Sequence, residues 1–494
     1  MCSRVPPVAL CCWLACSGCT SQGEQTESEP EPDPNPDSCA ANETALPDGS
    51  CLFAGMGPED CAPGFEHDGM VSCEPILPPE ACPPGQLAVI GESSCREVSP
   101  CGDGTWGDIP VEASTQHVDG TYPGNDSDGT SARPWATIGQ AYAAAAPQAI
   151  IAVAAGSYVE DLTIQNKPVR LWGRCPSLVE MVGTGQGVGA VTITTGAQGT
   201  EVRGLAITGA GAGVVSTGST DVALEALWVH HTASVGVGTE SSLGPTSLRL
   251  VGSLVEGNHQ MGVLSSGAQI TIEGCVVRDT LPIAPDSYNQ RYGWGIAINA
   301  HPTMGDPAEA LVRGCLIERN HAQGMVVDGA GATTVEGCVV RDNRVDHEGI
   351  FGEGITAQLN EASGQPATLT VRGCLLERNC QSGLSIHGSS GVVETSLIRH
   401  TQPDGHGAFG SGITLQGHPD AGLRGTLTLQ SSVIEHNHRT GLFVAGADAT
   451  VARSVLGSTS TTPAGLYGDG VVVRYDDRWN ADSTLVASES RLDH

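Results

Sequence analysis

Acidic residues and histidines gather in two short segments of the chain and are candidates for catalysis or for binding a cation. The residues concerned are Asp346, His347, Glu348, Glu353, Asp404 and His406. Paired carboxylates serve glycoside hydrolysis or bind calcium, and a histidine can act as a general base. Asp, Gly and His are also ordinary in turn-rich loops, so a purely structural role is the competing interpretation.

A second set of candidates belongs to long insertions that end in matching phrases, YGWGI, FGEGI, FGSGI and YGDGV. The insertions recur about every 58 residues, so we expect loops that project from one side at matching heights and stack on each other. Loops on a rigid scaffold are where binding usually occurs. The binding-loop candidates are Tyr288, Arg291, Tyr292, Trp294, Tyr475, Arg478 and Trp479.

The segment NDSDGT offers a further possible metal site. Asp126 and Asp128 have the residue type and proximity that a calcium ion requires, although a plain turn explains them equally. We expect no other cofactor.

The elements that position these residues are indicated by a recurring sequence motif, for example VEGCVVRD or VRGCLIERN. One position of the motif, called the Cys/Ser column below, is occupied in successive repeats by Ser253, Cys275, Cys315, Cys338, Cys374, Ser396, Ser432, Ser454 and Ser490. The steps alternate between short and long, so the unit is a two-rung repeat of about 58 residues, regular from about residue 247. Period-2 apolar alternation followed by a Gly-containing turn indicates short strands, and the repeat length indicates a parallel β-helix. The column is expected to be a stack of small buried side chains.

Two further columns follow in register. Asn258, Asn320, Asn343, Asn379 and Asn437 stand five residues after the Cys/Ser column. We expect them to form the turn between two sheets in the left-handed region and a ladder of stacked amides. Gly-aliphatic pairs such as Gly354-Ile355 come next, with Gly expected to make a turn.

The repeats resemble the right-handed parallel β-helix proteins of the pectate-lyase-like superfamily. The segment from Asp128 to Gly173 is similar to the N-terminal cap and first coil of that superfamily, in which a short amphipathic helix closes the solenoid. Trp135, Ile138, Ala141 and Tyr142 have one-face spacing for such a helix at about 134–146. Gly405-His406-Gly407 matches a piece of the polygalacturonase signature, but its accompanying segments are missing. The resemblance implies a fold and no particular activity.

Composition excludes one class of partner. The chain carries 55 acidic and 23 basic residues, a formal charge of −32, which argues against nucleic acid. A polyanionic ligand would need calcium or a local arginine cluster.

The N-terminus predicts export. Residues 1–18 have the short apolar run of a signal peptide, and CSGCTS resembles the lipobox of bacterial lipoproteins, with Cys19 as the lipidated residue. Cys16 is the alternative acceptor, and an ordinary secretory signal is the alternative explanation. Residues 19–38 are acidic and Pro-rich and predict a disordered tether. We therefore expect an outer-membrane or cell-surface lipoprotein, with a periplasmic location as the alternative.

Seven cysteines crowd residues 39–101 and predict a disulfide module, with Cys175 as the eighth partner and the pairing left open. Cys380 is expected to be a free thiol. A connecting segment, 102–130, leads to the β-helix at 131–494. We expect its C-terminal end to be uncapped, as in a truncated product, a fragment or a chain with a partner docked there.

The sequence therefore predicts an all-β, surface-anchored binding or adhesion protein that contacts extracellular polysaccharide through a row of loops. It touches the membrane only through its lipid. The alternatives are a polysaccharide lyase or glycosidase with carboxylates in the long-rung loops, and a structural spacer.

Overall fold

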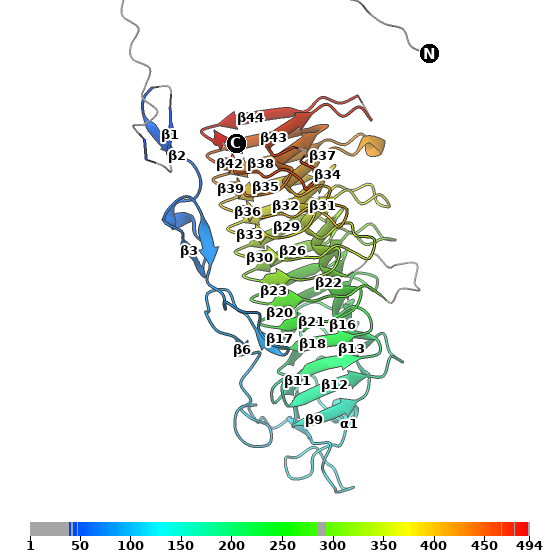
Figure 1. Ribbon diagram of the computed structural model, residues 1–494. Helices are drawn as coiled ribbons and strands as arrows, with labels where there is room; N and C mark the ends of the chain where they lie inside the picture. Colours follow the sequence, from blue (N-terminus) through cyan, green and yellow to red (C-terminus); the bar gives the residue numbers. More distant parts are fainter. Residues whose placement is uncertain are drawn as a thin grey trace, which may run out of the picture.

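The structure is a computed structural model that describes residues 39–40, 43–46, 48–283, 293–465, 467–478 and 480–492. Within them the chain winds into a solenoid whose coils each add one strand to each of three parallel sheets (Figure 1). The predicted β-helix is confirmed.

The twelve-stranded sheet contains the strands that carry the long insertions. Its strands are β10 (Leu162–Ile164), β13 (Gly189–Ile193), β16 (Ala212–Thr217), β19 (Val237–Glu240), β22 (Met261–Ser266), β25 (Trp294–Asn299), β28 (Gln323–Asp328), β31 (Glu353–Gln358), β34 (Ser382–His387), β37 (Ser411–Gln416), β40 (Thr440–Ala445) and β43 (Asp469–Arg474).

The fourteen-stranded sheet precedes the Cys/Ser column in each coil. Its strands are β7 (Gln116–Val118), β8 (Ile150–Val153), β11 (Arg170–Gly173), β14 (Glu201–Arg203), β17 (Val222–Glu225), β20 (Ser247–Val251), β23 (Gln269–Glu273), β26 (Glu309–Arg313), β29 (Ala332–Glu336), β32 (Thr368–Arg372), β35 (Ser390–Glu394), β38 (Gly425–Gln430), β41 (Ala447–Ala452) and β44 (Thr484–Ser488).

The thirteen-stranded sheet lies between the Cys/Ser and Asn columns. Its strands are β9 (Gly156–Val159), β12 (Val179–Gly183), β15 (Ala206–Gly209), β18 (Trp228–Thr232), β21 (Leu254–Glu256), β24 (Val276–Arg278), β27 (Leu316–Glu318), β30 (Val339–Arg341), β33 (Leu375–Glu377), β36 (Leu397–Arg399), β39 (Val433–Glu435), β42 (Val455–Gly457) and β45 (Arg491–Leu492).

The Cys/Ser column is a buried stack, as predicted. The backbone N–H of Cys275 donates to the sulfur of Cys315, and Cys315 does the same to Cys338, each at 3.4 Å. Serine fills the same role further along, where the Cys374 N–H donates to Ser396 Oγ at 3.1 Å. Either residue satisfies one buried backbone donor of the preceding coil, which explains why they interchange.

The Asn column forms the predicted amide ladder but not the predicted turn. Asn320 Nδ2 donates to Asn343 Oδ1 at 3.2 Å, and Asn343 Nδ2 donates to Asn379 Oδ1 at 2.8 Å. The left-handed residue is instead the one before each asparagine, for example Asp342 at φ 55° and Arg378 at φ 50°. The turn precedes the column because the amide must point into the solenoid to reach its neighbours.

The Gly column is also not the turn that we predicted. A Cβ on Gly354 would lie 2.4 Å from the carbonyl oxygen of Gly383 and 2.7 Å from Asn379 Nδ2. These glycines are therefore required by the close approach of successive coils rather than by a positive φ.

Charges alternate over five successive strands of the fourteen-stranded sheet, in step with the two-rung repeat. The last residues of successive strands from β23 to β35 are Glu273, Arg313, Glu336, Arg372 and Glu394, and each pairs with the next. Identical rungs would instead stack like charges about 4.8 Å apart.

The N-terminal end of the solenoid is closed by helix α1 (Ile138–Ala144), within the predicted cap segment. Thr137 caps it, and Ile138 and Ala141 are fully buried against the core, with Trp135 and Tyr142 packed partly against it.

The cysteine-rich segment, residues 54–101, lies along the outside of the thirteen-stranded sheet and is called the strap below (Figure 1). Its hairpin strands are β3 (Phe65–His67), β4 (Cys73–Pro75), β5 (Gln86–Leu87) and β6 (Arg96–Glu97), preceded by the hairpin β1 (Glu43–Ala45) and β2 (Cys51–Phe53). The disulfides are Cys39–Cys51, Cys61–Cys73, Cys82–Cys95 and Cys101–Cys175. Cys175 is thus the eighth partner, as predicted.

The strap runs opposite to the solenoid. Gly55 bonds to Arg453 in a late coil, Glu74 pairs with Arg399, and Cys101 is tied to Cys175 in the first coil. Its apolar side chains cover a row of outward aliphatic residues that includes Leu254, Val276 and Leu316. The outer face of this sheet is thereby covered from β21 to β42.

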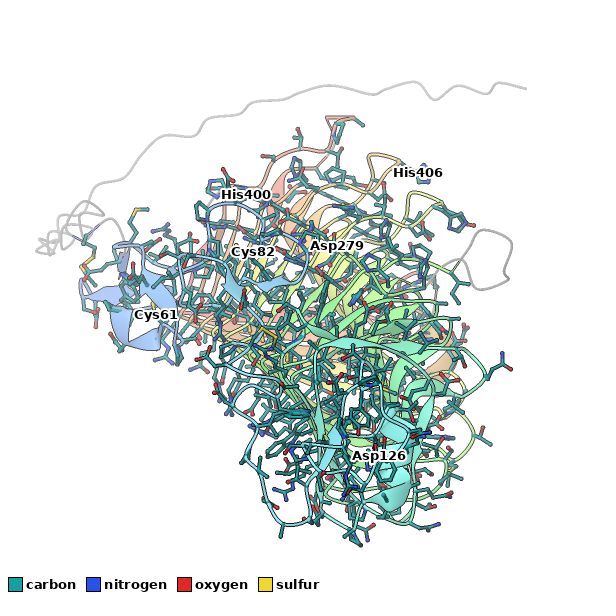
Figure 2. All side chains as sticks on the ribbon, turned by 90° about the horizontal axis from the view of Figure 1, so that it is seen from below. Cys61, Cys82, Asp126, Asp279, His400 and His406 are labelled. Atoms are coloured by element: carbon teal, nitrogen blue, oxygen red, sulfur yellow. A yellow bond between two sulfur atoms is a disulfide. The ribbon has the colours of Figure 1, made fainter. Side chains whose placement is uncertain are left out.

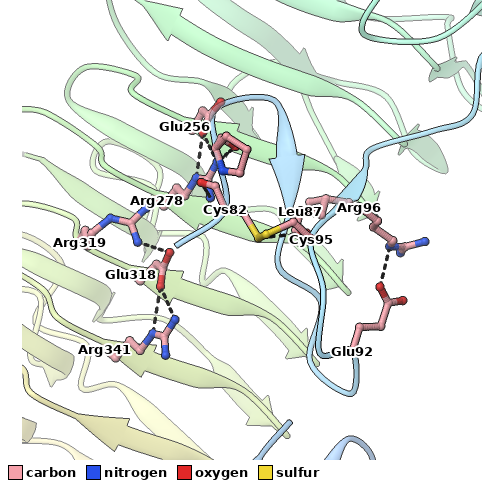
Figure 3. The surroundings of a disulfide bond; sticks show 11 residues. Cys82, Leu87, Glu92, Cys95, Arg96, Glu256, Arg278, Glu318, Arg319 and Arg341 are labelled. Atoms are coloured by element: carbon pink, nitrogen blue, oxygen red, sulfur yellow. Dashed lines mark hydrogen bonds and ion pairs between the residues drawn. A yellow bond between two sulfur atoms is a disulfide. The ribbon is translucent and has the colours of Figure 1, made fainter. Parts of the chain in front are cut away.

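A buried ion pair joins strap and solenoid. Arg278 donates to Glu256 Oε2 at 2.8 Å and to the carbonyl oxygens of Cys82 and Pro83 at 3.1 and 3.0 Å. Glu256 also accepts from the Gly85 N–H, at 2.8 Å. Figure 3 shows this node beside the Cys82–Cys95 disulfide.

In the last coil Val486 and Leu492 are largely exposed. Among the described residues, no helix combines the length and apolar character that a bilayer crossing needs.

Candidate functional site

Loops at both ends of the same strands mark the twelve-stranded sheet as the candidate site. The entry loops precede β31, β37 and β43 and span 342–352, 400–410 and 458–468. The exit loops follow β31, β37 and β43 and span 359–367, 417–424 and 475–483. Both rows recur every second rung, roughly 10 Å apart along the solenoid axis.

The entry loops stack on each other, as predicted. The Gly405 N–H donates to the Gly349 carbonyl at 2.8 Å, and His406 Nε2 donates to the Glu348 carbonyl at 2.9 Å. His406 lies on a loop that projects from the solenoid, away from Cys61 in the strap (Figure 2). His347 and Glu348 lie 3.9 Å apart on the same loop surface.

The two aspartates of these loops hold turns. Asp346 Oδ1 accepts from the backbone N–H groups of Glu348 and Ile350, and Asp404 Oδ1 accepts from those of His406 and Ala408. Their identical bonding at equivalent positions explains why both residues recur at this spacing.

An aromatic column occupies the end of each described entry loop. Phe351, Phe409 and Tyr467 are equivalent, with φ of 65°, 64° and 66°. A bulky side chain in the left-handed region costs on the order of 1 kcal/mol. Phe409 and Tyr467 are 41% and 51% exposed, so burial of the ring does not offset that cost.

A groove follows the exit loops. Two adjoining hollows of about 350 Å³ each share His387 and His418. Asp328 and Gln358 line one, and Asp420 and Arg478 line the other. Asp328, Gln358, His387 and Gln416 are the last residues of neighbouring strands and form one row across the sheet.

Glu353 lies apart from the other predicted acidic residues, at the start of β31. The residue is 4% exposed, and its carboxylate accepts from Gln323 Nε2, Thr356 Oγ1 and Ser385 Oγ at 2.7, 2.9 and 2.8 Å. Residues 355 and 357 face the core, so Thr356 belongs to the outer face of the sheet and the network lies there.

Burial shifts the pKa values of His387 and Asp328 in the groove. Burial lowers the pKa of His387, against the opposing attraction of the Glu353 carboxylate. Burial raises the pKa of the Asp328 carboxyl, although amide donors from Gln358 and Asn360 oppose the shift. At neutral pH His387 is therefore a neutral acceptor, and Asp328 keeps its proton to a higher pH than an ordinary aspartate.

The remaining predicted residues are dispersed. Trp294 begins β25, Tyr475 lies in the last exit loop, and Arg478 pairs there with Asp476 at 2.5 Å. Asp128 accepts from Thr130 and pairs with Arg133, while Asp126 accepts from the Tyr122 hydroxyl. Calcium at that turn stays a prediction. Cys19, Tyr288, Arg291, Tyr292 and Trp479 lie outside the described residues, and lipidation likewise stays a prediction.

Sequence reasoning missed Asp328, His387 and His418. The sequence did carry a signal for them. Asp328 and His387 each end a strand, at the same distance from the Gly column, and His418 lies in the turn that follows such a strand. Only the register of the coils shows that these positions share one groove.

Comparisons with known proteins agree with this architecture. A profile described as a right handed beta helix region matches residues 299–402, and a profile for a protein of unknown function, DUF1565, matches residues 122–239. Among curated proteins no sequence matches the chain.

Several solved structures are similar in shape. The catalytic domain of a GH87 α-1,3-glucanase in complex with tetrasaccharides has a TM-score of 0.51 at 11% identity, covering 78% of this chain and 70% of that one. A thermostable GH87 α-1,3-glucanase from Streptomyces thermodiastaticus gives 0.44 at 14% identity, covering 72% and 67%. A pectate lyase gives 0.39 at 11% identity, covering 64% and 76%. The likeness is one of fold, and the chain is a right-handed parallel β-helix.

Proposed function

We propose that this protein binds a linear polysaccharide that lies along the solenoid axis over the entry loops. The observation that carries the proposal is the aromatic column of Phe351, Phe409 and Tyr467, spaced by two rungs and kept in a costly left-handed backbone. The apolar faces of sugar rings pack on aromatic side chains, and a regular row of rings suits a polymer with a regular repeat.

The fold is compatible with such a ligand. The α-1,3-glucanase with the same fold was solved with tetrasaccharides, so a solenoid of this kind can hold a carbohydrate chain. The left-handed aromatics add an argument from this chain itself, because strain retained at equivalent positions points to a function of the side chain.

The test replaces the exposed rings without disturbing the turns. Phe409→Asn and Tyr467→Asn keep a residue that tolerates the left-handed region while removing the ring. Tyr475→Asn is the matched control, since Tyr475 belongs to the same coil as Tyr467 but lies in an exit loop, 44% exposed.

Retention in affinity electrophoresis through gels that contain neutral or uronic polysaccharides would be measured. We expect each entry-loop substitution to weaken retention about threefold to tenfold, with the control unchanged. If Tyr467→Asn and Tyr475→Asn changed retention equally, the polysaccharide would not be bound over the entry loops.

A second candidate function is cleavage of the polysaccharide in the exit groove. It is favoured by Asp328, whose pKa is raised, and His387, whose pKa is lowered, which line the same hollow with His418. A carboxyl that keeps its proton to a higher pH suits the general acid of glycoside hydrolysis.

New reducing ends and unsaturated products would reveal cleavage. Asp328→Asn should abolish any turnover, while Glu361→Gln, whose side chain is 85% exposed in the exit loop, should not. Turnover that survives Asp328→Asn would remove this candidate.

A further inference from the structure

One position in the short turns that alternate with the entry loops differs between repeats. Gln260, Ala322, Gln381 and Arg439 are equivalent, with left-handed φ of 67°, 61°, 61° and 61°. Each carbonyl accepts from the glycine that begins the next strand phrase, as Arg439 does from Gly468 at 2.9 Å. The backbone is thus built identically with Gln, Ala or Arg, and the turn does not require a cation.

The Arg439 side chain lies among aromatic rings. Its guanidinium carbon is 4.9 Å from the ring centres of both Phe409 and Tyr467, and 5.7 Å from that of Phe443. Cation–π contacts from three rings hold the planar group and restrict its rotamers.

Arg439 has no ion pair with any residue that the structure describes, and its Nε is buried without a hydrogen-bond partner. Arg319 and Arg378 of the solenoid, by contrast, are each paired with two carboxylates. The buried Nε is closed to solvent, so the donors available to an external anion are the two amino groups of the guanidinium, in a chain with a formal charge of −32.

We propose that Arg439, between Phe409 and Tyr467, binds an acidic group of the polysaccharide. This rests on the proposed function and narrows its ligand to a polymer that carries carboxylate or sulfate groups. The guanidinium fork suits either oxyanion through two parallel hydrogen bonds, and the exposed rings hold the flanking sugars. The positive charge of Arg439 also offsets locally the repulsion between the acidic protein and a polyanionic ligand.

The test compares three probes by isothermal titration with the full chain: an oligogalacturonate, its fully methyl-esterified form, and a sulfated galactan oligosaccharide. Arg439→Gln installs the residue that two other repeats already hold at this position. Arg249→Gln removes the same charge from the fourteen-stranded sheet and is the control.

We expect the wild-type protein to prefer an acidic probe over the ester. Arg439→Gln should weaken binding of that probe roughly 10- to 100-fold while leaving the ester within about twofold. The affinity of Arg439→Lys for the acidic probe should lie between those of the wild type and Arg439→Gln, because an ammonium group lacks the planar guanidinium fork. Dependence on Arg439 for the sulfated probe alone would identify the group as a sulfate ester.

Equal affinity for acid and ester, or an acid preference that Arg439→Gln leaves intact, would overturn the inference while leaving polysaccharide binding in place. Binding of no probe by the wild-type chain would overturn the proposed function itself. Phe409→Asn should weaken binding of the ester as well as of the acid, which Arg439→Gln should not, and it should weaken the acid more because the ring also holds the guanidinium.

Discussion

Replacing Arg278 by methionine should release the strap from the solenoid. Arg278 and Glu256 are 1% and 5% exposed, so the substitution leaves a buried carboxylate without its cation and two strap carbonyls without their donor. Breaking a buried pair of this kind costs about 3–5 kcal/mol. If that cost falls on docking of the strap, the undocked population should rise roughly 10²- to 10⁴-fold.

The control is Arg249→Met. Arg249 also pairs with two glutamates, Glu225 at 3.1 Å and Glu273 at 3.2 Å, but its side chain is 50% exposed. An exposed pair contributes under about 1 kcal/mol, so the control should change little.

Native-state hydrogen exchange provides the assay. The Gly85 amide, which donates to Glu256, should lose protection in Arg278→Met while amides of the inner coils keep theirs. Equal exchange at Gly85 in both variants would refute the argument that burial of the pair fixes the strap.

Three further predictions concern the fold. Cys101→Ser with Cys175→Ser opens a 74-residue covalent loop, which should lower the free energy of unfolding by about 4 kcal/mol in denaturant titrations and expose the strap to protease. Gly354→Ala should lower the free energy of unfolding by roughly 1–3 kcal/mol or more. Gly211→Ala should lower it far less, because no atom lies closer than 3.6 Å to the added Cβ. Equal denaturant midpoints for the two variants would contradict the packing argument. Burial lowers the pKa of His230 to about 4, so between about pH 6.5 and 4 the unfolded chain takes up a proton that the folded chain refuses. Stability should therefore fall by up to about 3 kcal/mol across that window, and His230→Gln should flatten the pH profile of the denaturant midpoint.

The solenoid could be predicted from the sequence because every coil packs on its neighbour through the same residue types at equivalent positions. Cys275 and Asn343 each serve the neighbouring coil, so their columns persist in the sequence. The function of a column was harder to infer than its existence. Gly354 and Asn343 were both assigned to turns, whereas close approach of coils and an inward amide explain them.

The docking of the strap was missed although the sequence carried its signal. Strand phrases such as LVE and LIE place two apolar residues in succession, and alternation sends one of each pair outward. Because Leu254 and Leu316 point outward, another segment of the protein is expected to pack on the outer face of the thirteen-stranded sheet. The groove residues depend on register between coils of unequal length, which spacing alone does not determine.

The central claim is that a polysaccharide lies along the entry loops. Hydrogen exchange of the wild-type chain, with and without a saturating acidic oligosaccharide, tests it most directly. New protection is expected only at residues 342–352, 400–410 and 458–468 and at the turn around Arg439. Protection confined to the exit loops, to the strap or to the fourteen-stranded sheet would contradict it.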